Sequence, residues 1–177
     1  MDLIDEEGYR ANVGIILTDG GGRVLIAGRS GRSGWQFPQG GVRPDESTED
    51  AMYRELEEEV GLTPADVDLI GATQDWLRYR LPERFIRRVE GPVCIGQKQR
   101  WFLLQLVTSP DRLRFDLSDE PEFDRCRWVD YWRPVKEVIY FKRRVYVRAL
   151  TELGSLAFPG DGPPPRPTWW PQRWLAN

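Results

Sequence analysis

Histidine is absent from all 177 residues of this chain. Its absence excludes Ser-His-Asp and Cys-His nucleophilic centres, histidine-ligated zinc sites and nucleases that use a histidine general base. Catalytic chemistry in this protein must therefore rest on carboxylates, with Lys, Arg or Tyr assisting.

Cysteine and long apolar runs are also scarce. The two cysteines, Cys94 and Cys126, lack metal-type or redox spacing, which fits buried thiols in a reduced protein, although only geometry can exclude a disulfide between them. The acidic first ten residues contain no apolar core of a signal peptide, and no apolar run is long enough to span a bilayer. We therefore expect a cytoplasmic protein that does not bind membranes.

Length and charge set two further limits. A chain of 177 residues predicts one domain with room for a real core. The net charge of −3 shows no overall basic excess that would indicate a nucleic-acid partner, so local charge must be considered instead. Nothing in the composition identifies a protein partner.

The most informative stretch is residues 40–62, GGVRPDESTEDAMYRELEEEVGL. Ser47 can cap a helix by accepting from the backbone N–H of Asp50, and Gly61 can end it in the left-handed conformation. We therefore expect a helix from about Ser47 to Val60. Its apolar stripe, which packs on a core, consists of Met52, Tyr53, Leu56 and Val60.

Three carboxylates fall together on one edge of this helix: Glu55, Glu58 and Glu59. Like charges at these spacings repel by roughly 0.2–0.5 kcal/mol per pair, and they face the negative end of the helix dipole. Arg54 reaches Glu58 at i,i+4, but one cation does not neutralise three anions. A hard divalent cation would neutralise them, because such ions prefer oxygen ligands. If the three glutamates are considered alone, the alternative interpretation is a solvated acidic face.

The spacing of the whole stretch resembles the signature of the Nudix hydrolases. It runs Gly40, five residues, Glu46, seven residues, Arg54-Glu55-Leu56, one residue, Glu58-Glu59, one residue, Gly61-Leu62, with every fixed position matched. The resemblance implies an α/β class fold, an α/β/α sandwich with a mixed central sheet, and hydrolysis of a diphosphate linkage that depends on Mg²⁺ or Mn²⁺. It implies metal ligands or a base at Glu55, Glu58 and Glu59, a metal-binding position at Gly40 and a catalytic role for Arg54.

A basic segment follows between Trp76 and Arg100. Its seven cations face only Glu83 and Glu90, and Trp76, Tyr79 and Phe85 lie between them. Cations with interleaved aromatic rings are typical of single-stranded nucleic-acid binding. The equally weighted alternative is a solvated loop whose arginines balance the acidic helix.

Around these stretches we expect strands at residues 9–18, 24–27, 69–76, 101–107 and 127–129. The glycines at 20–22 lie between two predicted strands, which favours a hairpin turn over a phosphate loop. Trp35 and Phe37 are expected to hold their loop to the core. The acid-rich loop at 115–125 offers further carboxylates whose spacing does not select a metal ligand: Asp119, Glu120, Glu122 and Asp124.

The C-terminal part predicts one helix from Pro134 to about Leu153 and then a tail. Lys142 lies inside the apolar face of that helix, where it either extends to solvent or, with Phe141, meets a phosphate and a base. We expect a domain at 1–156 and a flexible tail rich in Pro, Gly and Trp at 157–177. The tail tryptophans, which either dock on the domain or anchor a partner, are Trp169, Trp170 and Trp174.

A narrower resemblance covers residues 8–153. Segments such as GYRANVGI, GWQFPQGG, WLRYRLP, PVCIGQKQRWFLLQL, PEFD and FKRRVY are similar to the bacterial RNA pyrophosphohydrolase branch of the Nudix group. That branch removes pyrophosphate from the 5′-triphosphate end of RNA and so promotes mRNA decay. The resemblance implies Glu122 as an additional metal ligand, and it implies substrate contacts by Arg10, Arg29, Tyr79, Phe141 and Lys142.

Two other functions remain open from the sequence. Hydrolysis of dinucleoside polyphosphates would use the same carboxylates. A non-catalytic module of the same fold could bind RNA or protein through its arginines and tail tryptophans, although it would have no reason to keep mutually repelling charges.

Overall fold

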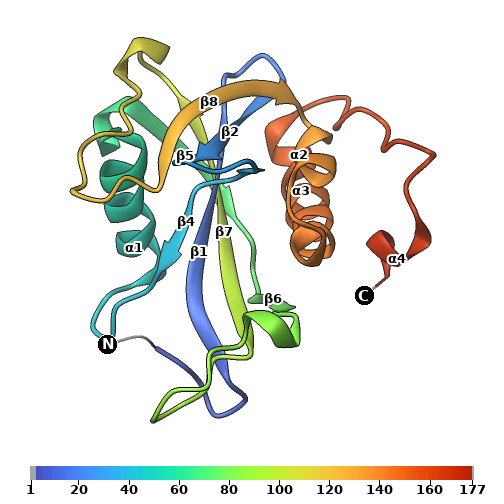
Figure 1. Cartoon of the computed structure of the whole chain (residues 1–177). Helices are drawn as coiled ribbons and strands as arrows, with labels where there is room; N and C mark the ends of the chain where they lie inside the picture. The colour runs from blue at the N-terminus through green and yellow to red at the C-terminus, as the bar shows by residue number, and fades with distance from the viewer. Residues whose placement is uncertain (1–2, 177) are drawn as a thin grey trace.

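The structure, a computed structural model, describes residues 3–176 (Figure 1). Its strands are β1 Tyr9–Thr18, β2 Arg23–Arg29, β3 Trp35–Gln36, β4 Gln39–Gly41, β5 Val67–Ala72, β6 Leu77–Arg80, β7 Gly96–Leu106 and β8 Phe123–Asp130. Its α-helices are α1 Thr48–Glu55, α2 Arg133–Glu137, α3 Arg143–Ala157 and α4 Gln172–Leu175. Shorter helical turns are η1 Leu56–Val60, η2 Pro64–Asp66, η3 Glu83–Phe85, η4 Pro110–Arg112 and η5 Tyr140–Lys142.

The strands form one mixed sheet whose main path has the order β3-β2-β1-β7-β5. β1 and β7 run parallel in a register that extends from Tyr9 opposite Gly96 to Thr18 opposite Gln105. The remaining pairings are antiparallel: β2 and β4 pair with β1, β3 and β8 pair with β2, and β5 and β6 pair with β7. The predicted mixed central sheet is confirmed.

Helices cover both faces of this sheet. Side chains alternate along a strand, so Ile15 of β1 packs in the core under α1, whereas Ile16 packs in the core under α3. In β7, likewise, Phe102 packs in the core under α1 and Trp101 packs in the core under α3. Figure 1 shows α1 on one side of the sheet and α2 and α3 on the other. The predicted α/β/α sandwich is therefore confirmed.

The predicted acidic helix is present, with one irregularity. The Ser47 hydroxyl accepts from the Asp50 backbone N–H at 3.0 Å, and α1 begins directly afterwards. After Glu55 the helix continues as the π-helical turn η1, and Gly61 ends it with φ 77°. Such single π turns widen a helix locally and occur often at functional sites.

The single helix predicted from Pro134 to Leu153 is wrong, because the structure divides it. α2 ends at Glu137, and Val138 takes an extended conformation with ψ 155°. Val138 and Ile139 are β-branched, which lowers helix propensity, and Val138 gains burial in the core at 2% exposure. The break lets η5 and α3 run in a new direction.

The strand predictions were right in kind but not in extent. Thr18 pairs with Val24 across the glycine turn, which confirms the β1–β2 hairpin. β6 was not predicted, because its two arginines obscure an alternation in which Leu77 and Tyr79 are buried at 3% and 6% exposure. β7 also begins five residues before the expected start at Trp101.

The C-terminal segment packs on the domain through two of its tryptophans. Trp170 and Trp174 are 5% and 9% exposed in the core under α3, whereas Trp169 remains 59% exposed. The indole N–H of Trp132 donates to the Pro164 carbonyl at 2.6 Å. Of the two alternatives for the tail tryptophans, docking on the domain is observed for Trp170 and Trp174.

Two further expectations concern the whole chain. Cys94 and Cys126 are both half-buried free thiols, so no disulfide joins them. Within residues 3–176 we find no helix with the length and apolarity that a membrane crossing requires.

Candidate active site

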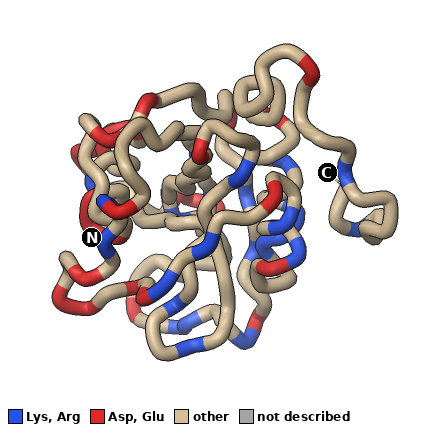
Figure 2. Tube along the Cα trace, turned by 90° about the horizontal axis from the view of Figure 1, so that it is seen from above, with Lys and Arg blue, Asp and Glu red and all other residues tan. Residues whose placement is uncertain are grey.

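The carboxylates of Glu55, Glu58 and Glu59 meet at the junction of α1 and η1. One oxygen from each lies within 4.8 Å of the others, close enough to share a metal ion. Figure 2 shows the acidic residues gathered mainly on the side of the molecule that carries α1. The grouping follows from helical spacing alone, as predicted, and it places the three anions on the edge that faces the sheet.

Arg54 organises this acidic edge through all five of its guanidinium N–H groups. Nε and one terminal nitrogen donate to the Glu46 carboxylate at 2.8 and 2.7 Å, and that same nitrogen also donates to the Gly41 carbonyl at 2.8 Å. The other terminal nitrogen donates to Glu55 at 2.8 Å and to Glu58 at 3.4 Å. The hydrogen bond to Arg54 lowers the pKa of Glu46. Arg54 is thus a positioning residue that joins β4 to the acidic helix.

Gly40 lies directly against the carboxyl group of Glu55. A Cβ atom at position 40 would overlap that carboxyl group, so a side chain there is incompatible with the observed rotamer. The close approach is the physical reason for glycine at this position. It also puts the backbone of β4 next to the carboxylate cluster.

Burial changes the acidity of these carboxyls. Glu55 is only 9% exposed, and this burial raises its pKa from 4.5 to about 7, although the Arg54 guanidinium opposes the shift. Burial also raises the pKa of Glu59, against the hydrogen bond that it accepts from the Glu122 backbone. Glu55 and Glu59 therefore hold their protons more firmly than ordinary glutamates do.

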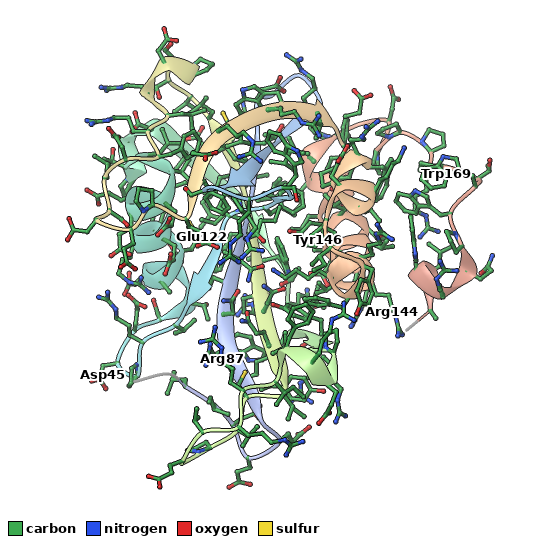
Figure 3. The ribbon with its side chains drawn as sticks, viewed as in Figure 1. Asp45, Arg87, Glu122, Arg144, Tyr146 and Trp169 are labelled. Atoms are coloured by element: carbon green, nitrogen blue, oxygen red, sulfur yellow. The ribbon has the colours of Figure 1, made fainter. Side chains whose placement is uncertain are left out.

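Glu122 comes from the distant loop before β8 and joins the same group. Its backbone N–H donates to the Glu59 carboxylate at 3.4 Å, and its carbonyl accepts from the Ser30 N–H at 2.8 Å. A register shift between β2 and β8 beside Gly28 and Arg29 accompanies this placement. Glu122 is exposed as a residue, and its carboxylate accepts from the Gln36 side-chain amide at 3.3 Å. Desolvation, followed by the charge of Glu59, raises its pKa. Figure 3 shows Glu122 between α1 and α3.

A cavity of about 600 Å³ opens beside this acidic group, and Glu122 forms part of its wall. Four of the five residues predicted to contact substrate line it: Arg29, Tyr79, Phe141 and Lys142. The fifth, Arg10, lies on β1, and its Cα pairs with Gln97, which lines the cavity. The fold therefore brings the predicted substrate residues next to the predicted metal ligands.

Lys142 points into the protein and does not extend to solvent. It is 9% exposed, and its Nζ donates to the side-chain oxygens of Gln36 and Gln39 at 3.4 and 3.3 Å. Desolvation lowers its pKa to about 8, against the attraction of Glu122. Lys142 therefore gives the cavity a positively charged wall, and the ring of Phe141 gives it an aromatic surface next to that charge.

The two glutamines that hold this cation in place were not predicted from the sequence. Gln36 and Gln39 flank Phe37 in the motif GWQFPQGG, whose aromatic residues and glycines are its more prominent features. Phe37 is fully buried, as predicted, and its backbone N–H donates to the Tyr146 hydroxyl of α3 at 2.9 Å. The available signal in the sequence was the presence of two side-chain amides beside an aromatic residue. Their partner, Lys142, is more than 100 residues away in the sequence.

The basic segment is only partly balanced by acids, and its partners differ from those expected. Arg78 pairs with Glu7 at 2.9 Å and Lys98 with Asp5 at 3.0 Å. The alternative in which these arginines balance the acidic helix is wrong for these two, because their partners come from the N-terminal loop. Arg87 instead lines the cavity, and Figure 3 shows it below the site.

A family profile described as the NUDIX domain matches residues 8–150. The chain belongs to the NUDIX family. Nudix hydrolases act on phosphoric anhydrides and generally use divalent metal ions. The acidic group described above provides only oxygen donors, which are the ligands that hard divalent cations prefer.

Two curated relatives of this Nudix chain are RNA pyrophosphohydrolases. The protein of Alkalilimnicola ehrlichii is 59% identical over 165 residues, which are 93% of this chain and 91% of the relative. That of Thioalkalivibrio sulfidiphilus is 59% identical over 161 residues, which are 91% of this chain and 93% of the relative. The similarity thus extends over nearly the whole length of each protein.

Solved structures support the Nudix fold. The dihydroneopterin triphosphate pyrophosphohydrolase of E. coli superposes with a TM-score of 0.62 and 19% identity, covering 80% of this chain and 95% of that protein. At this identity the likeness concerns the fold alone.

Proposed function

We propose that this chain is an RNA 5′-pyrophosphohydrolase, which removes pyrophosphate from 5′-triphosphorylated RNA, leaves a 5′-monophosphate and so promotes mRNA decay. The observation that carries the proposal is that Glu122 belongs both to the acidic group and to the wall of the cavity. This residue contacts the acidic edge through Glu59 and also lines the cavity that holds Lys142 and Phe141. Identities of 59% to two RNA pyrophosphohydrolases support the proposal.

The proposed cofactor is Mg²⁺, with Mn²⁺ as the alternative, and the proposed ligands are Glu55, Glu58, Glu59 and Glu122 beside the Gly40 backbone. When bound, the cation lowers the pKa of a water and offsets charge on the phosphate oxygens. Oxygen atoms within 4.8 Å of one another and a buried Glu55 fit such an ion. Arg54 keeps two of these carboxylates in a fixed orientation.

Hydrolysis requires a water oxygen to replace the oxygen that bridges the α and β phosphates. Glu55 is the proposed base that accepts the water proton, because Arg54 and Gly40 fix its carboxylate. Arg29 and Arg10 would attract the triphosphate of the RNA, and Lys142 would attract its phosphate backbone. Phe141 and Tyr79 offer rings for a base, with centroids 5.9 Å apart. Such a substrate is consistent with the cytoplasmic location that we propose.

The decisive experiment compares substrates. We expect kcat/KM for a triphosphorylated oligonucleotide to exceed that for diadenosine tetraphosphate, with pyrophosphate released and activity lost in a chelator. Restoring Mg²⁺ and Mn²⁺ separately identifies the preferred ion. Faster hydrolysis of the dinucleotide would support the rival activity, and the absence of any pyrophosphate would support the non-catalytic module.

A further inference from the structure

A second groove of about 400 Å³ adjoins the substrate cavity. It lies between β6, η5 and α3, and two residues, Tyr79 and Phe141, line both spaces. The groove therefore begins where the proposed base-binding wall ends.

The lining of this groove is strongly basic. It contains four arginines and no carboxylate: Arg78, Arg80, Arg144 and Arg148. Two of them have local partners, since Arg78 pairs with Glu7 and the Arg144 Nε donates to the Ala176 carbonyl at 3.0 Å. The guanidinium groups of Arg80 and Arg148 are exposed and form no ion pair with any carboxylate in residues 3–176. Figure 3 shows Arg144 between α3 and α4.

Aromatic rings continue from the cavity into the groove. The Tyr140 ring is 49% exposed and stands edge-on to Phe141, with centroids 5.5 Å apart. The Arg84 guanidinium lies 5.7 Å from the Tyr140 centroid. Exposed rings flanked by guanidinium groups are what a single strand of nucleic acid needs, because bases stack on rings and phosphates attract cations.

We propose that this groove, which we call the exit groove, binds the RNA strand downstream of the nucleotides held at Phe141. The inference rests on the proposed function: a strand whose triphosphate meets the acidic edge can leave the cavity over Tyr79 and Phe141, which line both spaces. Continuity with the cavity and the excess of arginines select the substrate's own backbone as the occupant. A dinucleotide would be too short to reach the arginines of α3.

The test compares a triphosphorylated dinucleotide with a triphosphorylated oligonucleotide of about eight nucleotides, over a range of salt concentrations. The variant is Arg80→Gln combined with Arg148→Gln, and its matched control is Arg112→Gln combined with Arg114→Gln. The control removes the same charge from exposed residues near η4, where the partners are Asp66 and Asp116. Thermal unfolding checks that both variants fold.

We expect the wild-type protein and the control to prefer the longer RNA, and the exit-groove variant to lose that preference. Each phosphate contact on a single strand contributes about 0.7 to the slope of log kcat/KM against log salt concentration, so losing two contacts lowers the slope by about 1.4. An unchanged slope and length preference, or an equal effect in the control, would overturn the inference. Failure of the wild-type protein to hydrolyse either triphosphorylated RNA would instead count against the proposed function.

Discussion

Replacing Glu55 with glutamine is expected to stabilise the metal-free protein while impairing catalysis. Glu55 is 9% exposed, and its pKa is raised from 4.5 to about 7, mainly by burial. Glutamine keeps the shape of the side chain and an oxygen for the Arg54 N–H that lies 2.8 Å away. It removes the buried charge, which in the absence of a cation opposes folding.

The size of the effect follows from the shift in pKa. One pKa unit corresponds to about 1.4 kcal/mol, so ionised Glu55 lowers the free energy of unfolding by on the order of 3 kcal/mol. Between pH 4.5 and about 7 the folded state binds more protons than the unfolded state does. The stability of the wild-type protein should therefore fall as the pH rises through this window, and Glu55→Gln should not show this component.

The assay is urea unfolding in a chelator at about pH 4.5 and about pH 8.5. We expect the variant and the wild type to have similar free energies of unfolding at the lower pH and to diverge at the higher. Glu57→Gln is the matched control, because Glu57 is exposed on the same helix and its substitution should change stability by less than about 0.5 kcal/mol. Equal or lower stability of Glu55→Gln at the higher pH would refute the reasoning.

Adding Mg²⁺ should narrow this difference in stability. A cation that binds only the folded state at about 100 times its Kd stabilises by about 2.7 kcal/mol, and the wild-type protein should gain more than Glu55→Gln. The same variant should lose most of its kcat. Stabilisation together with inactivity is a result that a merely structural glutamate would not give.

Four further predictions concern other parts of the molecule. Gly40→Ala should lower kcat by about 100-fold with little change in Tm, because the methyl group displaces the Glu55 carboxyl; steady-state kinetics beside thermal unfolding will separate the two effects. Arg54→Lys should lower the free energy of unfolding by about 3 kcal/mol, because an ammonium cannot replace five directed N–H groups, and urea unfolding that matches the wild type would contradict this. Lys142→Gln should remove a rise in stability between about pH 8 and 10.5, where the unfolded wild-type chain binds more protons than the folded one; unfolding at several pH values tests this sign. Trp170→Ala should cost about 3 kcal/mol, because the ring is 5% exposed against Trp132, and an unchanged unfolding midpoint would show that the tail does not contribute to stability.

The sequence by itself determined the features that depend on neighbours in the chain. The cap at Ser47, the end at Gly61 and the grouping of Glu55, Glu58 and Glu59 were predictable, because helical spacing fixes which residues share an edge. The Nudix fold was also predictable, since the signature carries its spacing in one continuous stretch. Its π-helical turn was not, because no local pattern in the residues marked it.

Only the tertiary structure decided the features that depend on contacts between distant segments. Glu122 meets Glu59 across 63 residues, and Lys142 meets Gln36 across 106. The break after Glu137 was decided in the same way, because burial of Val138 in the core outweighs the continuation of a helix. Propensity and periodicity describe one segment at a time, whereas burial and partner choice depend on how the segments pack.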